Sequence, residues 1–475
     1  SAEQVLKEKL LQSGLNPPGF EVPLRNLRAE AALFRTENLP LFNEEARLCN
    51  EYNKVIGAQT VSWQGQEATI AQLRPVYQQS DRSLREQAWR LATTRQLADR
   101  ATLNELWQKL LRLRLQIAEN ANQPDYRTYC WQTKARFDYT PQDCLSFHRA
   151  IEQAVLPALR RMLERRRARL GVDALRPWDL DVDAMSRPAL TPFQTIEQLK
   201  QGASAIFHRV DEQLGRYFDI MQAEALLDLE NRKNKAPGAY CTEYPLIHRP
   251  FIFMNAVGIH DDVQTLLHES GHAFHVFESD ALPYHQQREC PMEFAEVASM
   301  GMELLAAPYL TEFYTPAQAA RARIQHLEQN LLFWPYMAVV DAFQHWVYEN
   351  PQQALEPENC DQTWEALWQR FMIGVDWSGL EEERRTGWHR KLHIFTVPFY
   401  YIEYGLAQLG AAQVWGNALR DQAGAVAAYR RALALGGSVP LPTLYQTAGA
   451  RLAFDANTLQ QSVDLIANTL DQLDA

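Results

Sequence analysis

The sequence predicts a predominantly helical protein with two lobes and one small β-ribbon. Its 475 residues exceed the ~250–300 residues at which a single hydrophobic core usually divides, so two lobes are expected. Hydrophobic residues make up 46% of the chain and charged residues 22%, a composition typical of globular proteins. Helical periodicity covers most of the sequence, and only one stretch has a strand-like pattern, which indicates an all-α class with a small β-ribbon.

The helical pattern is clearest between residues 99 and 121, where leucines and isoleucines recur at spacings of three and four. Residues 144–170 continue with an apolar stripe and a basic run that ends at Arg169. We interpret this run as a solvated helix face and not as a site for an anionic partner, because most runs of like charge are solvated. Prolines between 177 and 192 predict a loop or a connection between lobes, and helical spacing resumes over 194–229.

The predicted ribbon consists of residues 239–244 and 251–255, two short runs rich in aromatic and β-favouring residues. Pro245 and Pro250 bracket the link between the two runs. This is the one place where the pattern changes to strand, and helices are expected again from about Asp261 to the C-terminus.

Charge and cysteine content exclude several classes of partner. A net charge of -11 argues against nucleic acids and anionic membrane surfaces as partners. No apolar run reaches ~18 residues, so no membrane span is expected. The six cysteines form no C-x-x-C pair, and the N-terminus has no pattern of a secretory signal. We therefore expect a cytoplasmic protein, while no pattern predicts its oligomeric state.

Residues 265–272 contain the motif H-E-x-x-H, formed by His268, Glu269 and His272. On a helix, residues four apart lie on one face, so the two imidazoles can bind one zinc ion at about 2.0–2.1 Å. Glu269 lies about 100° further round the helix. At that place it can flank the metal without binding it, which suits a general base acting on water that the metal activates.

The alternative for this motif is an exposed helix with incidental histidines. The surrounding segment is rich in apolar residues, which predicts a buried helix. Burying two histidines and a carboxylate is costly unless they are paired or bind a metal. Gly271 inside the helix costs about 1 kcal/mol relative to Ala, which a close approach by substrate or by another helix would explain.

A catalytic zinc ion takes three protein ligands and keeps one open position, so a third ligand is expected elsewhere. Residues 291–300 are predicted to begin an apolar helix in which Glu293, Glu296 and Glu303 share one face. Any of the three carboxylates could be the ligand. Alternatively, all three are carboxylates favoured by the helix dipole, and spacing alone does not decide.

Residues 262–275, which contain the motif, resemble the thimet oligopeptidase and oligoendopeptidase F family of zinc peptidases, and most closely its oligoendopeptidase F side. The third ligand of that family lies in a motif similar to residues 295–299, which favours Glu296. Further similarity to the family lies in residues 121–126, 235–241, 253–255 and 393–404.

The resemblance implies a zinc metalloendopeptidase with one zinc ion per chain and short peptides as substrates. It also implies a helical body with the zinc ion at the floor of a deep channel that excludes folded proteins. We expect residues 1–235 to form a mostly helical distal lobe and channel wall, and residues 236–475 to form the zinc-binding catalytic region. Family members usually begin further upstream, so an N-terminal helical segment is expected to be missing.

The resemblance also implies donors for the oxyanion of the tetrahedral intermediate. His393, Tyr401 and Tyr404 are the candidates, and the two tyrosines share a helix face because they are three residues apart. Without the resemblance, this aromatic cluster is more typical of core packing. With it, His393 and Tyr404 are favoured as catalytic residues, and Tyr401 less so.

The ribbon residues Gly238, Ala239 and Tyr240 are candidate substrate-binding residues. A peptide added as a further strand would be held by its backbone, whatever its sequence. The alternative is a ribbon with a purely structural role.

The remaining candidates concern the surroundings of the metal. Asp262 or Glu303 could accept the second N–H of a ligating histidine, and the sequence does not decide between them. We interpret His275 as a packing residue or as support for a ligand. Four further histidines are interpreted as structural: His260, His285, His345 and His389.

Two rival functions remain open. A zinc carboxypeptidase of similar helical build needs a cationic residue to hold the terminal carboxylate of the substrate, and Arg249 or Lys391 could serve. A catalytically inactive peptide-binding protein is the second rival. The intact motif argues against it, because loss of Glu269 would be the simplest route to an inactive site.

Overall fold

The computed structural model describes residues 2–232, 235 and 238–474. Helices dominate these residues, which confirms the predicted fold class. The chain divides into two compact units, of which the first comprises residues 1–31, 190–330 and 403–475 and the second comprises residues 32–189 and 331–402. Among the described helices, none is long and apolar enough to cross a membrane.

Three helices, α2, α14 and α19, contain a unit boundary, and each is given with the unit that holds most of it. The elements of the first unit are α1 (Ala2–Ser13), α2 (Glu21–Leu33), α9 (Ile196–Val210), α10 (Glu212–Ala223), β3 (Leu227–Glu230), β4 (Tyr240–Tyr244), β5 (Arg249–Ala256), α11 (His260–Ser279), α12 (His285–Arg288), α13 (Met292–Ala306), η3 (Ala307–Glu312), α19 (Tyr401–Ala418), α20 (Gln422–Leu433), α21 (Leu441–Thr447) and α22 (Ala456–Asp474).

The elements of the second unit are α3 (Asn38–Gly57), β1 (Thr60–Trp63), β2 (Gln66–Thr69), η1 (Ala71–Leu73), α4 (Arg74–Tyr77), α5 (Arg82–Leu97), α6 (Arg100–Asn120), α7 (Tyr126–Thr133), α8 (Pro141–Leu170), η2 (Pro177–Asp179), α14 (Pro316–Glu349), α15 (Pro351–Ala354), α16 (Pro357–Phe371), α17 (Glu381–Arg385), η4 (Gly387–Arg390) and α18 (Leu392–Thr396). The predicted division between residues 1–235 and 236–475 stays a prediction, and residues 236 and 237 lie outside the described residues.

The predicted ribbon is part of a three-stranded sheet in the first unit, with strand order β3-β5-β4. Strands β4 and β5 are antiparallel, with Tyr240 opposite Phe253, and β3 runs parallel to β5. Strand β3 falls inside the stretch predicted as helix, so that prediction is wrong for its last residues. Helix α10 ends at Ala223, and the positive φ of Ala225 (55°) is a left-handed conformation that a continuing helix does not contain.

The second unit contains a β-hairpin, β1–β2, which the sequence interpretation missed when it placed strands at a single site. Its two-residue loop, Gln64 and Gly65, has φ values of 50° and 81°, as a tight primed turn requires. The buried side chain of Val61 packs in a small cluster with Leu73 and Ala92. A run of Thr-Val-Ser-Trp before a loop with glycine was the available signal, but four-residue strands carry little periodicity.

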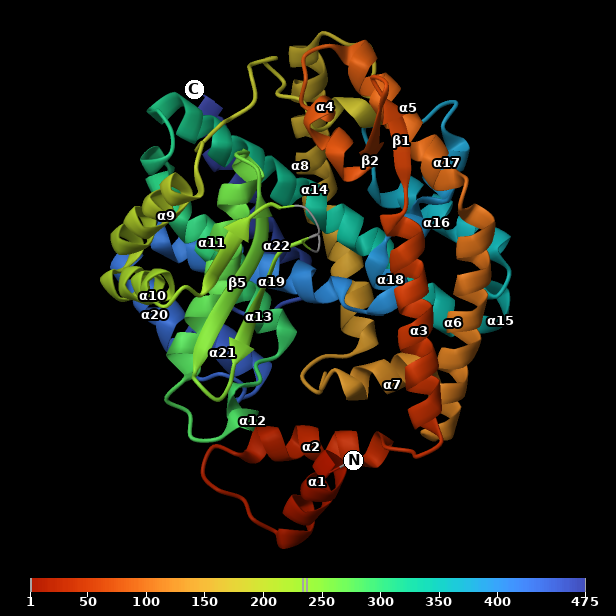
Figure 1. Cartoon of the computed structure of the whole chain (residues 1–475), viewed down its shortest axis with the longest axis vertical. Helices are drawn as coiled ribbons and strands as arrows, with labels where there is room; N and C mark the ends of the chain where they lie inside the picture. The colour runs from red at the N-terminus through yellow and green to blue at the C-terminus, as the bar shows by residue number, and fades with distance from the viewer. Residues whose placement is uncertain (1, 233–234, 236–237, 475) are drawn as a thin grey trace. The chain divides into compact units, whose positions relative to one another are not determined.

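Helix α11 packs against the sheet on one side and against α13 on another (Figure 1). Side chains along β5 alternate between buried and partly exposed, so one face of the strand belongs to the core. Ile252 and Met254 are buried residues of that face. In the second unit, Trp107 of α6 packs edge-on against Trp388 and Phe395, at 5.3 and 5.7 Å between ring centroids. Each unit therefore has a core of its own.

Candidate metal centre

The start of α11 is held by a carboxylate cap. Asp262 accepts hydrogen bonds from the backbone N–H groups of Val257, Gly258 and Ile259, at 2.8, 2.8 and 3.0 Å. These N–H groups belong to the turn that precedes α11, and the helix itself supplies no acceptors for them. Asp262 therefore positions the helix that carries the H-E-x-x-H motif, and its Oδ2 atom accepts all three bonds of this cap.

Gly271 lies where α11 crosses α13 most closely. A Cβ atom at this position would lie 2.5 Å from the carbonyl oxygen of Ala298 and 2.6 Å from Cα of Ser299. Real side chains do not tolerate such distances to backbone atoms. Of the two explanations that the sequence allows for this glycine, the structure supports a close approach by another helix.

Replacing Gly271 with Ala is expected to lower the free energy of unfolding by about 1–3 kcal/mol, because the added methyl group overpacks the crossing. Chemical denaturation of the metal-free protein measures this loss. The matched control is Gly57→Ala in α3, where an added Cβ meets nothing within 4 Å. If both substitutions changed stability equally, the crossing would not be the reason for the glycine.

The helix crossing brings the predicted third ligand to the two histidines. Glu296 Oε2 lies 3.4 Å from His268 Nε2 and 3.7 Å from His272 Nε2. One ligand atom from each of these residues lies within 4.8 Å of both others. Of the three glutamates that spacing left open, Glu296 is the one whose carboxylate joins the histidines.

This group fits a zinc ion. Two imidazole nitrogens and one carboxylate oxygen are a common protein ligand set of catalytic zinc, and bonds of ~2.0–2.2 Å in a tetrahedron separate ligand atoms by about 3.3–3.6 Å. The side chains of His268 and His272 are 24% and 21% exposed, whereas that of Glu296 is only 4% exposed. One side of the group therefore remains accessible, as a site with an open position needs.

A second carboxylate, that of Glu303, orients His268 through the ring nitrogen that does not face Glu296. Glu303 Oε1 lies 2.6 Å from His268 Nδ1, and its Oε2 lies 2.9 Å from His326 Nε2. Burial raises the pKa of Glu303, but hydrogen bonds from His268 and His326 outweigh this effect and hold the pKa at about 2. The carboxylate is therefore ionised and fixes the ring so that Nε2 faces Glu296. Of the two acceptors that the sequence left open, the structure places Glu303 at the histidine.

Other groups stabilise the remaining ligands. Ser299 Oγ lies 3.0 Å from Glu296 Oε2, so its hydroxyl can donate to the carboxylate. Burial lowers the pKa of His272 to about 4, which keeps its imidazole neutral and able to bind a metal. His275 is buried against the ring of Phe294, at 6.3 Å between centroids, and does not join the ligand group.

Glu269 lies beside the ligand group in a buried environment. Burial raises the pKa of Glu269 to about 7, and the nearby Glu296 contributes in the same direction, while His268 opposes it. The backbone N–H of Cys241, in strand β4, donates a hydrogen bond to the Glu269 carboxylate. A carboxyl group with a pKa near neutrality can both accept and release a proton at neutral pH.

The three predicted oxyanion donors are divided between the two units. His393 and Tyr401 lie in the second unit, with ring centroids 4.9 Å apart, and Tyr401 Oη accepts a hydrogen bond from Lys391 Nζ at 2.5 Å. Tyr404 belongs to the first unit. Their catalytic roles stay predictions.

Two contributors to the centre were missed by sequence reasoning. His326, on α14, follows Glu303 by 23 residues and belongs to no motif, so no spacing links it to the site. The N–H of Cys241 is a backbone group, and only the position of β4 beside α11 gives it a role. Neither contact leaves a signal in the residue types themselves.

The chain is similar to known peptidases over most of its length. The sequence model of the family described as "Peptidase family M3" matches residues 76–463. The "Oligoendopeptidase F homolog" of Mycoplasma pneumoniae is 22% identical over 474 residues, covering 91% of this chain and 75% of that protein. The Mycoplasma genitalium protein of the same name is 24% identical over 336 residues, covering 65% and 53%. The solved structure described as "PZ peptidase A with inhibitor 2" has a TM-score of 0.91 and 28% identity, covering 99% of this chain and 85% of that chain.

Proposed function

The chain belongs to peptidase family M3, a family of zinc metallopeptidases that act on oligopeptides, and we propose that it is an oligoendopeptidase whose zinc ion is held by His268, His272 and Glu296. Glu269 is the general base in this proposal. The observation that carries it is the convergence of three ligand atoms, two from α11 and one from α13, within 4.8 Å of one another.

The chemistry divides between the metal and the chain. When bound, a zinc ion at this centre supplies Lewis-acid chemistry, polarising the scissile carbonyl and making a water molecule more acidic. Glu269 accepts a proton from the attacking water and returns it to the leaving amine. Its pKa of about 7 suits both transfers. Glu303 and Ser299 hold His268 and Glu296 in place throughout.

Strand β4 supports a substrate-binding role for the ribbon. Within the described sheet β4 pairs only with β5, so its outer edge is available to a peptide strand. The hydrogen bond from the Cys241 N–H to Glu269 joins this strand to the general base. A peptide that extends β4 in this way would pass the ligand group, with Gly238, Ala239 and Tyr240 along its path.

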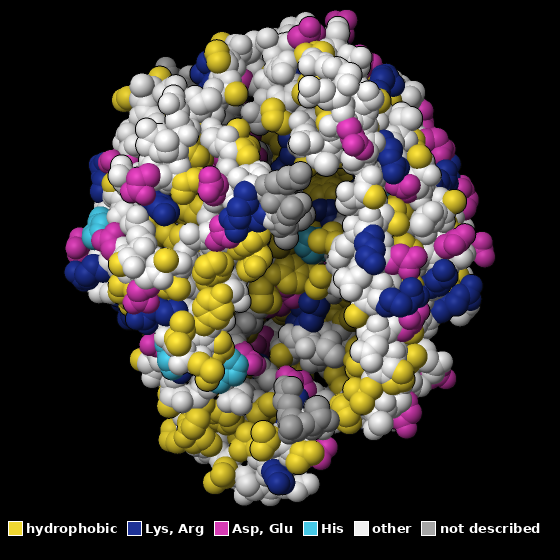
Figure 2. Space-filling model, viewed as in Figure 1, with side chains coloured by type: hydrophobic (Ala, Val, Ile, Leu, Met, Phe, Trp, Pro, Cys, Tyr) yellow, Lys and Arg dark blue, Asp and Glu magenta, His cyan; other side chains and the backbone are white. Residues whose placement is uncertain are grey.

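The outer face of the sheet adds apolar contact area. Tyr240 and Tyr244 are about half exposed, and Tyr240 stacks on Phe253 at 5.0 Å between centroids. Hydrophobic side chains gather in this region (Figure 2). Aromatic side chains at this face favour substrates with apolar residues at alternate positions of the bound strand.

The donors for the oxyanion in this proposal are His393 and Tyr404, with Tyr401 as a further candidate. An imidazole N–H or a phenol O–H can stabilise the negative charge that develops on the carbonyl oxygen. The Tyr401 phenol accepts a hydrogen bond from Lys391 Nζ at 2.5 Å, which fixes its position beside His393.

Removing zinc is expected to abolish peptide cleavage, and one equivalent of zinc is expected to restore it. The centre is partly exposed, so dialysis against a chelator reaches it. Metal analysis and the rate on a short fluorogenic peptide, measured on the same samples, check the result. Full turnover by protein with an empty centre would contradict the proposal.

An internally quenched peptide blocked at both ends separates endopeptidase from carboxypeptidase activity. We expect cleavage, because the guanidinium of Arg249, one candidate anchor for a terminal carboxylate, is already paired with Glu224 at 2.7 and 3.1 Å. Cleavage only of the peptide with a free C-terminus would instead support the carboxypeptidase. A folded protein serves as the second substrate, and its resistance is expected from the channel that the family resemblance implies.

A further inference from the structure

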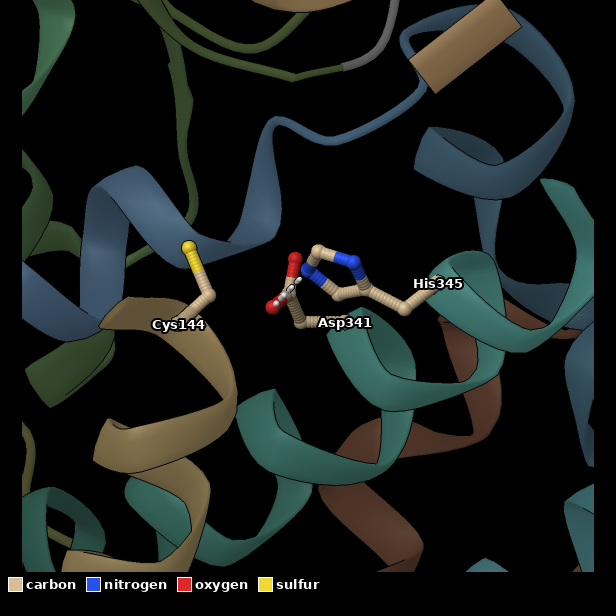
Figure 3. A group of neighbouring side chains, drawn as sticks. All are labelled: Cys144, Asp341 and His345. Atoms are coloured by element: carbon tan, nitrogen blue, oxygen red, sulfur yellow. Dashed lines mark ion pairs between the residues drawn. The ribbon is translucent and has the colours of Figure 1, made fainter. Parts of the chain in front are cut away.

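A second group of metal-binding side chains lies in the core of the second unit, apart from the proposed catalytic centre. Cys144 lies on α8, and Asp341 and His345 lie on α14, with one ligand atom from each within 4.8 Å of both others. All three residues are fully or almost fully buried. The Asp341 carboxylate lies between the sulfur of Cys144 and the ring of His345 (Figure 3). We propose that this group holds a structural zinc ion that joins α8 to α14.

The spacing on both helices supports this assignment. Cys144 and His148 are four residues apart on α8, and Asp341 and His345 are four apart on α14, so each pair shares one helix face. His148 Nε2 lies 2.9 Å from Asp341 Oδ2, and His345 Nε2 lies 3.3 Å from the same oxygen. His148 lies outside the group of three whose ligand atoms are mutually within 4.8 Å, but its contact with Asp341 places it beside that group, so a side-chain movement would make it the fourth ligand that structural zinc sites use.

The environment of Asp341 is a second, independent observation. Its side chain is completely buried, and its Oδ1 atom has no hydrogen-bond partner among the described residues. A buried carboxylate oxygen that accepts no hydrogen bond is costly unless a cation compensates it.

Charge and ligand type indicate zinc. A thiolate, a carboxylate and two neutral imidazoles carry two negative charges, which a divalent cation neutralises inside the apolar core. Thiolate and imidazole ligands select zinc over magnesium or calcium, which prefer oxygen.

Several contacts must change when the ion binds. The thiol of Cys144 loses its hydrogen bond to the carbonyl oxygen of Thr140, at 3.6 Å, and His148 Nε2 turns from Asp341 Oδ2 to the ion. Arg127 Nη1 lies 3.3 Å from His345 Nδ1, and the same guanidinium pairs with Glu349. Ligation by Nε2 places the ring proton on Nδ1, so Arg127 moves toward Glu349. Binding of the ion by Cys144 as a thiolate releases the thiol proton. Because the ligands are buried, the ion must bind while the protein folds.

Cobalt substitution tests the proposal, because only a thiolate ligand gives an intense sulfur-to-cobalt charge-transfer band in the near ultraviolet. The catalytic centre has no sulfur ligand, so the double variant His268→Gln/His272→Gln isolates the buried group. After refolding with cobalt, this variant is expected to bind about one ion per chain and to show the band, and wild type is expected to bind about two.

Cys144→Ser in the same background is expected to lose the band. Cys130→Ser, which changes another buried cysteine of the second unit, is the matched control and should keep it. If the double variant refolded without binding cobalt or zinc, or if the band survived Cys144→Ser, the group would be a hydrogen-bonded polar cluster only. Peptide cleavage by the wild-type protein is measured separately. A negative result for the buried zinc site is therefore distinguishable from a negative result for the proposed peptidase function.

Discussion

Glu269→Gln is expected to lower kcat by about 10²–10⁴-fold, the usual contribution of a general base, while zinc content stays close to that of wild type. Glutamine keeps the volume of the side chain and can still accept the hydrogen bond from the Cys241 N–H. It cannot accept the proton of the attacking water. The loss should therefore fall on kcat, with little change in peptide affinity.

Steady-state kinetics on a short peptide and metal analysis on the same preparation check this expectation. Asp261→Asn is the matched control, since it neutralises an exposed carboxylate on the same helix. The control should retain turnover near that of wild type. Loss of zinc from Glu269→Gln would show that the residue is a ligand, and near-normal kcat would remove it from the chemistry.

Local sequence patterns predicted many of the long helices and the two histidines of the proposed metal centre. The spacing of His268 and His272 places both rings on one face of any helix, so two of the three proposed ligands follow from the sequence. The family resemblance carried by the same segment is confirmed by the match to peptidase family M3. The long helices α6 and α8 were predicted because an apolar stripe of more than five turns is unambiguous.

The features that were missed depend on contacts between distant segments. Strand β3 has leucines at spacings that fit a helix as well as a strand, and only its pairing with β5 decides between them. Spacing could not choose among Glu293, Glu296 and Glu303, because the choice depends on how α13 crosses α11 at Gly271. The choice between Asp262 and Glu303 is similar, because Asp262 caps the helix, which leaves Glu303 for His268.

The second prediction with a large effect concerns Glu296. Glu296→Gln is expected to weaken zinc binding by more than the 10–100-fold typical of lost supporting contacts, because the substitution removes a direct ligand. A neutral amide is a poor zinc ligand, and the site also loses one negative charge beside two imidazoles. Peptide cleavage should then depend on added zinc, whereas in Glu269→Gln zinc addition should restore nothing.

Zinc titration followed by activity distinguishes these two behaviours. Glu293→Gln is the matched control, since this buried glutamate lies on the same helix and does not join the ligand group. It should bind zinc as wild type does. If Glu296→Gln kept its zinc and near-normal turnover while Glu269→Gln lost zinc, the two roles would be assigned wrongly. Glu303 would then be the next candidate for the third ligand, because its carboxylate already contacts His268 at 2.6 Å.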